Sequence, residues 1–147
     1  MKRRVIVMLI GLITTTAVLG SLPAFAGGGC TDTGTDQANN LLGTEGDDIL
    51  CGRDGDDRLS GGGGDDRLRG QEGRDLLIGA EGGDALKGGG DGDSLIGGPG
   101  VDRMNGGLGA DIIDASGGDA DVVRGSGGAD VCYVDRDDDV QGCEQVI

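Results

Sequence analysis

Residues 43–114 read GTEGDDILC GRDGDDRLS GGGGDDRLR GQEGRDLLI GAEGGDALK GGGDGDSLI GGPGVDRMN GGLGADIID, which is eight contiguous nonapeptides. The first residue of every unit is Gly, the sixth is Asp and the eighth is aliphatic. A fixed period of this kind distinguishes a repeat architecture from a low-complexity tail. The sequence therefore predicts a structure that stacks one small unit many times.

Each nonapeptide divides into a turn and a very short strand. Its Gly-rich half needs a positive φ at the fourth position, which is Gly in every unit except the one with Asp91. The last three residues alternate in polarity, which is typical of a strand. One unit cannot bury its single aliphatic side chain, so stacked units must align these side chains inside an all-β coil. The predicted interior ladder is Leu50, Leu59, Leu68, Leu77, Leu86, Leu95, Met104 and Ile113.

This core is thin, because burial of one aliphatic side chain does not offset the conformational entropy of nine ordered residues. The turns indicate a second source of free energy. Asp carboxylates at fixed spacing and turn carbonyls are hard oxygen ligands, which suit Ca²⁺ and argue against zinc or copper. The chain has no His, and its four Cys lack CxxC-type spacing, so structural zinc is not expected.

Over roughly residues 34–133 the units resemble the GGxGxDxUx repeats of RTX proteins. The resemblance implies a right-handed parallel β-roll, a solenoid of about ten repeats with two nonapeptides in each turn. It also implies that Ca²⁺ lies between one turn and the equivalent turn eighteen residues later. The implied ligands are turn carbonyls and two Asp ladders, namely Asp48, Asp66, Asp84, Asp102 and Asp121 in one and Asp57, Asp75, Asp93, Asp111 and Asp130 in the other. Pairing each repeat with its second neighbour gives about eight ions.

Weaker copies flank the contiguous repeats. Asn39 takes the sixth position of the first such copy and lacks a carboxylate, so it is left out of the ligand set. One inserted residue near Ala115, together with Asp119 at a fourth position, puts the geometry around Asp121 in question. The predicted organisation is a signal peptide (1–26), an N-terminal cap with a degenerate repeat and Cys30 (27–42), eight repeats (43–114), two degenerate repeats (115–133) and a C-terminal cap with Cys143 (134–147).

The first 26 residues have the layout of a secretory signal peptide. Residues 2–4 are basic, a mostly apolar stretch follows, and residues 24–26 fit a small-x-small cleavage site. The apolar stretch is short and interrupted by three Thr, which argues against a membrane anchor. We expect a secreted, extracellular chain that begins at Gly27 and has no membrane span after cleavage.

Residues 27–147 carry 27 acidic and 9 basic side chains, a net charge of −18. Nucleic acids and anionic membrane surfaces are poor partners for such a chain. About eight Ca²⁺ ions would nearly neutralise it, whereas the metal-free chain would repel itself. We therefore expect disorder without calcium and cooperative folding with it. Extracellular calcium modules bind at ~10⁻⁴–10⁻³ M, an affinity that leaves sites filled only outside the cell.

Four Cys in an exported chain predict two disulfides. They lie at the two ends of the repeat region, at positions 30, 51, 132 and 143. The sequence permits three pairings, and the spacing favours Cys30 with Cys51 and Cys132 with Cys143.

Positions seven and nine of each strand point outward, and alternate repeats lie on opposite sheets, so the two faces can be compared. One face collects the basic residues Arg67, Arg69, Lys87, Arg103 and Arg124. The other collects Leu76, Ile78, Ile96, Ile112, Val131 and Tyr133. An apolar strip of this kind suggests self-association or a protein partner, and short side chains with nothing to cover them are the alternative.

The predicted function is a secreted, non-catalytic calcium-binding protein with a structural or adhesive use. An enzyme is not expected, because no Ser-His or Cys-His set can form without His and the repeats leave little room for a substrate pocket. The alternative is an export or folding module related to those of RTX toxins, proteases or lipases, acting with a separate effector.

Overall fold

The computed structural model describes residues 29–117 and 119–147, so the predicted signal peptide lies outside the described residues. This part of the chain forms fourteen strands and no helix, and hence no helix that could cross a membrane. Sheet A contains β1 (Asp32–Thr33), β3 (Ile49–Asp54), β5 (Arg67–Glu72), β7 (Ala85–Gly89), β9 (Arg103–Leu108), β11 (Val122–Gly127) and β13 (Asp139–Gln141). Sheet B contains β2 (Asn40–Leu42), β4 (Arg58–Gly63), β6 (Leu76–Glu81), β8 (Ser94–Ile96), β10 (Ile112–Ala115), β12 (Val131–Val134) and β14 (Gln145–Val146).

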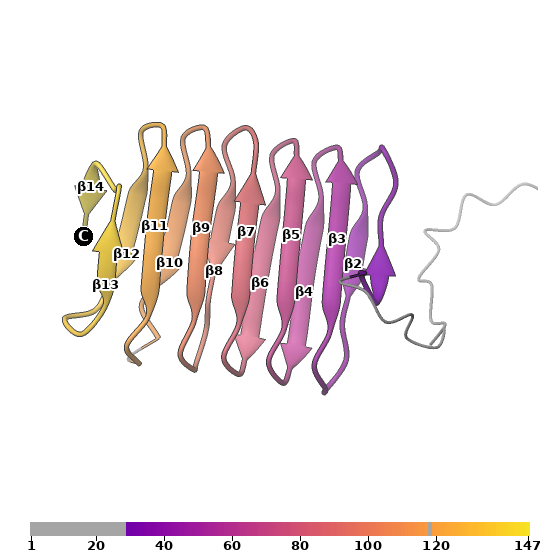
Figure 1. Ribbon diagram of the computed structural model, residues 1–147, viewed down its shortest axis with the longest axis horizontal. Helices are drawn as coiled ribbons and strands as arrows, with labels where there is room; N and C mark the ends of the chain where they lie inside the picture. The colour runs from indigo at the N-terminus through magenta and orange to yellow at the C-terminus, as the bar shows by residue number, and fades with distance from the viewer. Residues whose placement is uncertain (1–28, 118) are drawn as a thin grey trace, which may run out of the picture.

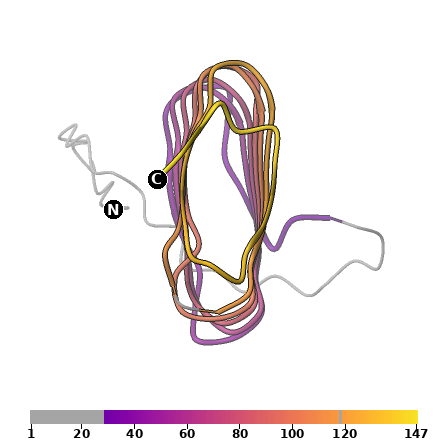
Figure 2. The same ribbon diagram turned by 90° about the vertical axis from the view of Figure 1, so that its left-hand side faces the viewer.

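The chain alternates between the two sheets, and each strand pairs in parallel with the strand one coil later. Odd-numbered strands run up the front while even-numbered strands run down behind, and the coil advances away from the N-terminus in the right-handed sense (Figure 1). Seen from its end, the coil is a flattened oval with two long sides joined by tight turns (Figure 2). The predicted right-handed parallel β-solenoid is confirmed. Its fourteen short strands exceed the ten or so repeats expected from the sequence, because both caps add strands.

The eighth-position side chains form the core, as their period predicts. Leu68 aligns with Leu86 across β5 and β7, and Leu77 aligns with Leu95 across β6 and β8. The whole cluster lies between the sheets, with one row of side chains from each sheet, and consists of Leu41, Leu50, Leu59, Leu68, Leu77, Leu86, Leu95, Met104, Ile113, Ala115, Val123 and Cys132. The core is thus one side chain wide in each sheet, and the parallel pairing of the strands holds the coils in register.

Positive φ angles occur at two positions of the repeat. The fourth position has φ values such as 110° at Gly73 and 67° at Asp91, as predicted. The second position shares this conformation, even where it is not Gly: φ is 92° at Arg53, 92° at Gln71 and 85° at Ala80. Side chains rarely adopt such angles, so these residues are strained by the same coil path that glycine follows freely elsewhere.

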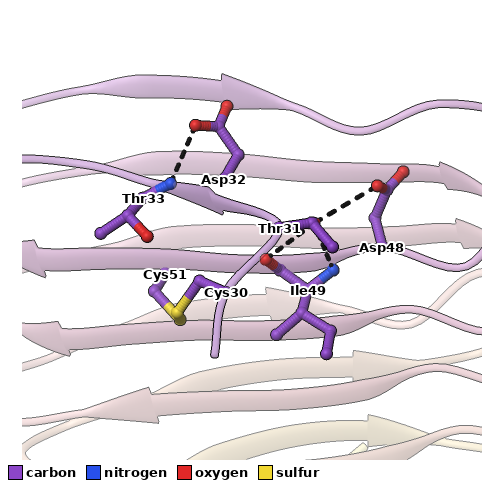
Figure 3. The surroundings of a disulfide bond; sticks show 7 residues. All are labelled: Cys30, Thr31, Asp32, Thr33, Asp48, Ile49 and Cys51. Carbon is purple, nitrogen blue, oxygen red and sulfur yellow. Dashed lines mark hydrogen bonds between the residues drawn. A yellow bond between two sulfur atoms is a disulfide. The ribbon is translucent and has the colours of Figure 1, made fainter. Parts of the chain in front are cut away.

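Both predicted disulfides are confirmed. Cys30 is bonded to Cys51 at the end of the β3 aliphatic stretch, which attaches the N-terminal segment to sheet A (Figure 3). Cys132 of β12 is bonded to Cys143, just before β14. No free cysteine occurs among the described residues. The two bonds therefore close the first and last coils of the stack.

The two outer faces differ as the alternation predicts. The basic side chains of Arg67, Arg69, Lys87, Arg103 and Arg124 belong to strands of sheet A, and the apolar set from Leu76 to Tyr133 belongs to strands of sheet B. Within residues 29–117 and 119–147 the one ion pair joins Arg74 and Asp56, at the solenoid edge. The basic side chains of sheet A thus lie apart from the acidic edges of the coil.

Candidate metal centre

The structure places the ten predicted Asp ligands in two rows, one along each edge of the flattened coil. Each Asp directly precedes a strand, so the strand register fixes its position in the row. Asp48, Asp66, Asp84, Asp102 and Asp121 precede strands of sheet A, and Asp57, Asp75, Asp93, Asp111 and Asp130 precede strands of sheet B. Asp48 is half-buried, and each of the other nine is at most 4 % exposed.

One oxygen of each carboxylate links neighbouring coils. The backbone amide of Asp66 donates to Oδ1 of Asp84 at 2.8 Å, and the amide of Asp84 donates to Oδ1 of Asp102 at 2.8 Å. The second row repeats this contact from Asp57 to Asp75, Asp93, Asp111 and Asp130, at 2.8–3.0 Å. Each Asp is therefore held in one orientation by the coil before it.

The second oxygen has no such partner. Oδ2 is buried and accepts no hydrogen bond within the described chain at Asp57, Asp66, Asp75, Asp84, Asp93, Asp102, Asp111, Asp121 and Asp130. A buried polar atom without a partner costs about 1–3 kcal/mol, and more if it is charged. Nine equivalent atoms in this condition, repeated along two rows, indicate that a cation is the missing partner.

The first-position glycines shape the space beside these oxygens. A Cβ on Gly61 would collide with Oδ2 of Asp66 and lie 2.8 Å from the carbonyl oxygen of Gly79 in the next coil. A Cβ on Gly52 would meet Oδ2 of Asp57 and the carbonyl oxygen of Gly70 in the same way. A carboxylate oxygen and a carbonyl oxygen from successive coils thus border one small space, which only Gly leaves open.

These oxygen ligands fit Ca²⁺. All of them are oxygens, and Ca²⁺ takes carboxylate and backbone carbonyl oxygens in flexible geometry. In the described residues no three His, Cys, Asp or Glu side chains converge as a metal cluster. An ion between coils must therefore combine Asp carboxylates with turn carbonyls, as the resemblance to RTX repeats implies.

The metal-free carboxyls are electrostatically unfavourable as anions. Burial raises the pKa of Asp93 from 3.8 to about 7, and the amide of Asp75 lowers it less than the burial raises it, while neighbouring carboxylates raise it further. Burial likewise raises the pKa of Asp66, Asp75 and Asp102 to about 6. At neutral pH these side chains need either a proton or a cation to remain buried.

The insertion near Ala115 does not displace Asp121. The amide of Asp102 donates to Oδ1 of Asp121 at 2.8 Å, although the two residues are nineteen rather than eighteen apart. Val122 still aligns with Arg103, because the extra residue is absorbed in the turn that precedes β11. Asp121 therefore shares two features with the regular repeats, an Oδ1 that accepts from the coil before it and a buried Oδ2 without a partner in the described chain, although Ser116 replaces Gly at the first position of its unit.

Two carboxylates that the sequence analysis missed extend the rows at the C-terminal end. Oδ1 of Asp138 accepts from the amide of Asp121 at 3.0 Å, and Oε2 of Glu144 accepts from the amide of Asp130 at 2.6 Å. Asp138 had a signal in the sequence, because Val140 follows it two residues later at the aliphatic position. Glu144 had the same signal, because Val146 follows it by two residues and aligns with Cys132, but Glu replaces Asp and the coil is shorter than a repeat pair.

The N-terminal end of the second row is neutral. The amide of Asn39 donates to Oδ1 of Asp57 at 2.7 Å, so Asn39 stands in line with the Asp residues. Its own Oδ1 accepts from the amide of Thr35 at 2.5 Å. The omission of Asn39 from the ligand set is consistent with this self-contained turn.

A parallel β-solenoid with buried carboxylates at one position of every turn defines a class of repeat protein that is stabilised by cations between its coils. The chain belongs to the RTX calcium-binding nonapeptide repeat family, whose pattern matches residues 33–68, 52–86, 60–95, 78–113, 87–120 and 115–141. No match is found among curated proteins or among solved structures. The chain is therefore a calcium-binding β-roll protein.

Proposed function

We propose that this chain is a secreted, non-catalytic protein that folds when it binds Ca²⁺ outside the cell and then has a structural or adhesive use. The single observation that supports this most is the set of nine buried Oδ2 atoms without a partner. They make the metal-free fold costly at neutral pH, and calcium removes that cost. The ten Asp in two rows, with one ion between successive coils, give about eight ions.

The charge of the chain supports coupling between folding and calcium. Residues 27–147 have a net charge of −18, and the solenoid gathers most of the acidic side chains along two narrow edges. Self-repulsion favours an expanded chain until divalent cations bind. Calcium at extracellular concentration therefore acts as the signal for folding after export. The two disulfides support the same location, because such bonds persist in oxidising compartments.

The structural or adhesive use needs an outer surface, for which we propose sheet B with a second copy of the chain as its occupant. Ile96, Ile112 and Tyr133 are 36 %, 50 % and 39 % exposed, and calcium binding would lower the repulsion between two copies. Sedimentation of the calcium-loaded protein tests this: Ile112→Ser should dissociate a dimer that wild type forms. A monomeric wild type at high concentration would exclude it.

The folding proposal is tested by circular dichroism and small-angle scattering of the chain from Gly27 onward, with both disulfides formed. At pH 8 we expect an expanded chain without strand signal in EGTA, and a compact strand-rich particle in millimolar Ca²⁺. Equal magnesium serves as the control, because Mg²⁺ demands near-ideal octahedral geometry and keeps its waters. Identical spectra and dimensions in EGTA and in Ca²⁺ would exclude the proposal.

A further inference from the structure

The last coil continues the sheet-B row of carboxylates in a different way from the coils before it. The register pairs Val131 with Gln145, so Glu144 occupies the position that follows Asp130 in the row. Oε2 of Glu144 accepts from the amide of Asp130 at 2.6 Å, as each Asp does from the coil before it. Only fourteen residues separate the two, against eighteen or nineteen in the regular coils. Glu therefore replaces Asp where the coil is short, and its extra methylene lengthens the reach of the carboxylate.

The space between Asp130 and this last coil has the features of the regular sites. Asp130 is fully buried, and its Oδ2 accepts no hydrogen bond within the described chain. A Cβ on Gly125 would collide with the carbonyl oxygen of Gly142 and lie 2.5 Å from Oδ2 of Asp130. The carbonyl of Gly142 thus takes the place that the carbonyl of Gly70 takes beside Asp57. Oδ2 of Asp130 and the carbonyl oxygen of Gly142 thus border one small space, and the Glu144 carboxylate accepts from the amide of the same Asp130.

The sheet-A row ends without such a site. Oδ1 of Asp138 accepts from the amide of Asp121 at 3.0 Å, and Oδ2 of Asp138 accepts from the amide of Asp135 at 2.7 Å. Both oxygens of Asp138 are therefore occupied by backbone amides. The observations favour a terminal site at Glu144 rather than at Asp138.

The disulfide positions the terminal carboxylate. Cys132 is fully buried at the end of the aliphatic row, and its partner Cys143 lies between Gly142 and Glu144 in the chain. The strand that follows, β14, has only two residues, and both are exposed. Four backbone hydrogen bonds join residues 144–147 to residues 130–134, and the Cys132–Cys143 bond is the covalent constraint on where the Gly142 carbonyl and the Glu144 carboxylate lie.

We propose that Asp130, the carbonyl of Gly142 and the carboxylate of Glu144 form a terminal Ca²⁺ site, in addition to the sites between successive Asp residues of the two rows. We also propose that the Cys132–Cys143 disulfide is required to hold this site together. The inference rests on the proposed calcium-dependent folding. Because one ligand-bearing segment is attached through a disulfide, this site is sensitive to reduction, whereas the regular sites are not. The ion count of the oxidised protein is then one higher than the ten Asp residues imply.

The test is equilibrium dialysis with radioactive Ca²⁺, which counts ions bound to the folded protein. Glu144→Gln removes the carboxylate charge with little change in shape, and we expect it to bind one ion fewer than wild type. Asp137→Asn is the matched control, because it removes the same charge from the same coil at an exposed position and should leave the count unchanged. Cys132→Val with Cys143→Ala keeps an aliphatic side chain in the core row and should also lose one ion. An unchanged count in Glu144→Gln would overturn the inference.

A second measurement does not depend on how any variant folds. Hydrogen exchange of the wild-type protein in millimolar Ca²⁺ should show protected amides at Asp130 and at residues 144–147, and reduction should release them while β5 to β9 stay protected. Equal protection of the last coil before and after reduction would exclude the role of the disulfide. A wild type that binds no Ca²⁺ at all would instead refute the proposed function, so the two failures are distinguishable.

Discussion

The two ends of the solenoid satisfy their polar groups by different means. At the N-terminal end, Thr31 takes the place before the strand, and its hydroxyl contacts the amide and the carbonyl of Ile49 at 2.8 Å and 3.0 Å (Figure 3). Oδ2 of Asp48 accepts from the amide of Thr44 at 2.6 Å and from its hydroxyl at 2.9 Å. At the C-terminal end, Oδ2 of Asp130 has no partner within the described chain. The N-terminal coil thus closes with its own hydrogen bonds, whereas the C-terminal coil depends on a cation.

The two ends show how a chain with almost no core can be stable at its termini. Both ends carry a disulfide, but Cys30–Cys51 attaches a segment with Thr31 at the row position, whereas Cys132–Cys143 attaches a segment with a carboxylate in the row. An uncharged residue at the row position ends the row of ions, whereas a carboxylate at that position extends it. The dependence on calcium should therefore increase from the first coil toward the last.

Acid gives the largest expected effect, because a proton can replace the cation at each buried carboxyl whose pKa is raised. The folded pKa of Asp93 is about 7 and that of Asp102 about 6, against 3.8 for the ordinary side chain. A raised folded pKa contributes stability below about pH 3.8, and that stability is lost as the pH rises through 6 to 7. In EGTA we expect strand signal at pH 5 and its loss at pH 8, measured by circular dichroism.

The same linkage predicts that protons compete with calcium. The midpoint of a calcium titration should move to higher concentration as the pH falls below 7, since the ion needs the deprotonated carboxylate. Asn39 and Thr31 do not titrate, so residue-resolved hydrogen exchange should show the first coil changing least with pH. A chain that has no strand signal in EGTA at any pH from 5 to 8 would contradict the prediction that acid stabilises the metal-free fold.

Removal of each disulfide in turn distinguishes the loop-closure entropy that a disulfide contributes to stability from its effect on ion binding. The bonds join residues 21 and 11 apart, so loop closure predicts a similar stabilisation of about 3 kcal/mol for each. Chemical unfolding in saturating Ca²⁺ should therefore show a larger loss of stability for Cys132→Val with Cys143→Ala, which also loses a bound ion, than for Cys30→Ser with Cys51→Ser. The ion count should fall only in the second pair. A lower ion count in the first pair would remove the distinction between the two ends.

Removing one carboxylate from a row, or adding one, tests whether the charge at the row position determines ion binding. Asp93→Asn keeps a hydrogen-bond acceptor for the amide of Asp75 but removes the charge beside the buried space. We expect the calcium concentration at the folding midpoint to rise by about tenfold, which is ~1.4 kcal/mol. Asn39→Asp should do the opposite, adding one ion at the neutral N-terminal end. Both are measured by calcium titration, and an unchanged ion count in Asn39→Asp would show that the first coil lacks the carbonyl oxygens for a site.

Backbone strain gives the smallest expected effect, and it should be equal at the two ends. Arg53 has φ of 92° in the N-terminal half, and Ser126 has φ of 84° in the C-terminal half. Replacing either with Gly relieves about 1–2 kcal/mol of strain and costs about 0.5–1 kcal/mol of chain entropy. Thermal unfolding in Ca²⁺ should show each variant stabilised by roughly 0.5 kcal/mol. A clear loss of stability in Arg53→Gly would show that its side chain has a role on the outer face of sheet A.

The missed carboxylates show where a period in the sequence stops being informative. Asp138 follows Asp121 by seventeen residues and Glu144 follows Asp130 by fourteen, so neither keeps the nonapeptide frame. The strands nevertheless pair in register, with Val122 beside Asp139 and Val131 beside Gln145. Turn length can vary while strand pairing is kept, because the ladder of backbone hydrogen bonds fixes the register.

The coil, its aliphatic core, the two rows of Asp and the separation of basic and apolar faces could all be predicted from the sequence, because each follows from a period of nine residues alternating between two sheets. Which carboxylate oxygens are paired could be seen only in the folded chain. Oδ1 of each Asp accepts from the coil before it, and Oδ2 remains without a partner except where Thr44 reaches it at Asp48. The physical reason is that each hydrogen bond joins residues in different coils, and their separation in space depends on strand pairing rather than on spacing in the chain.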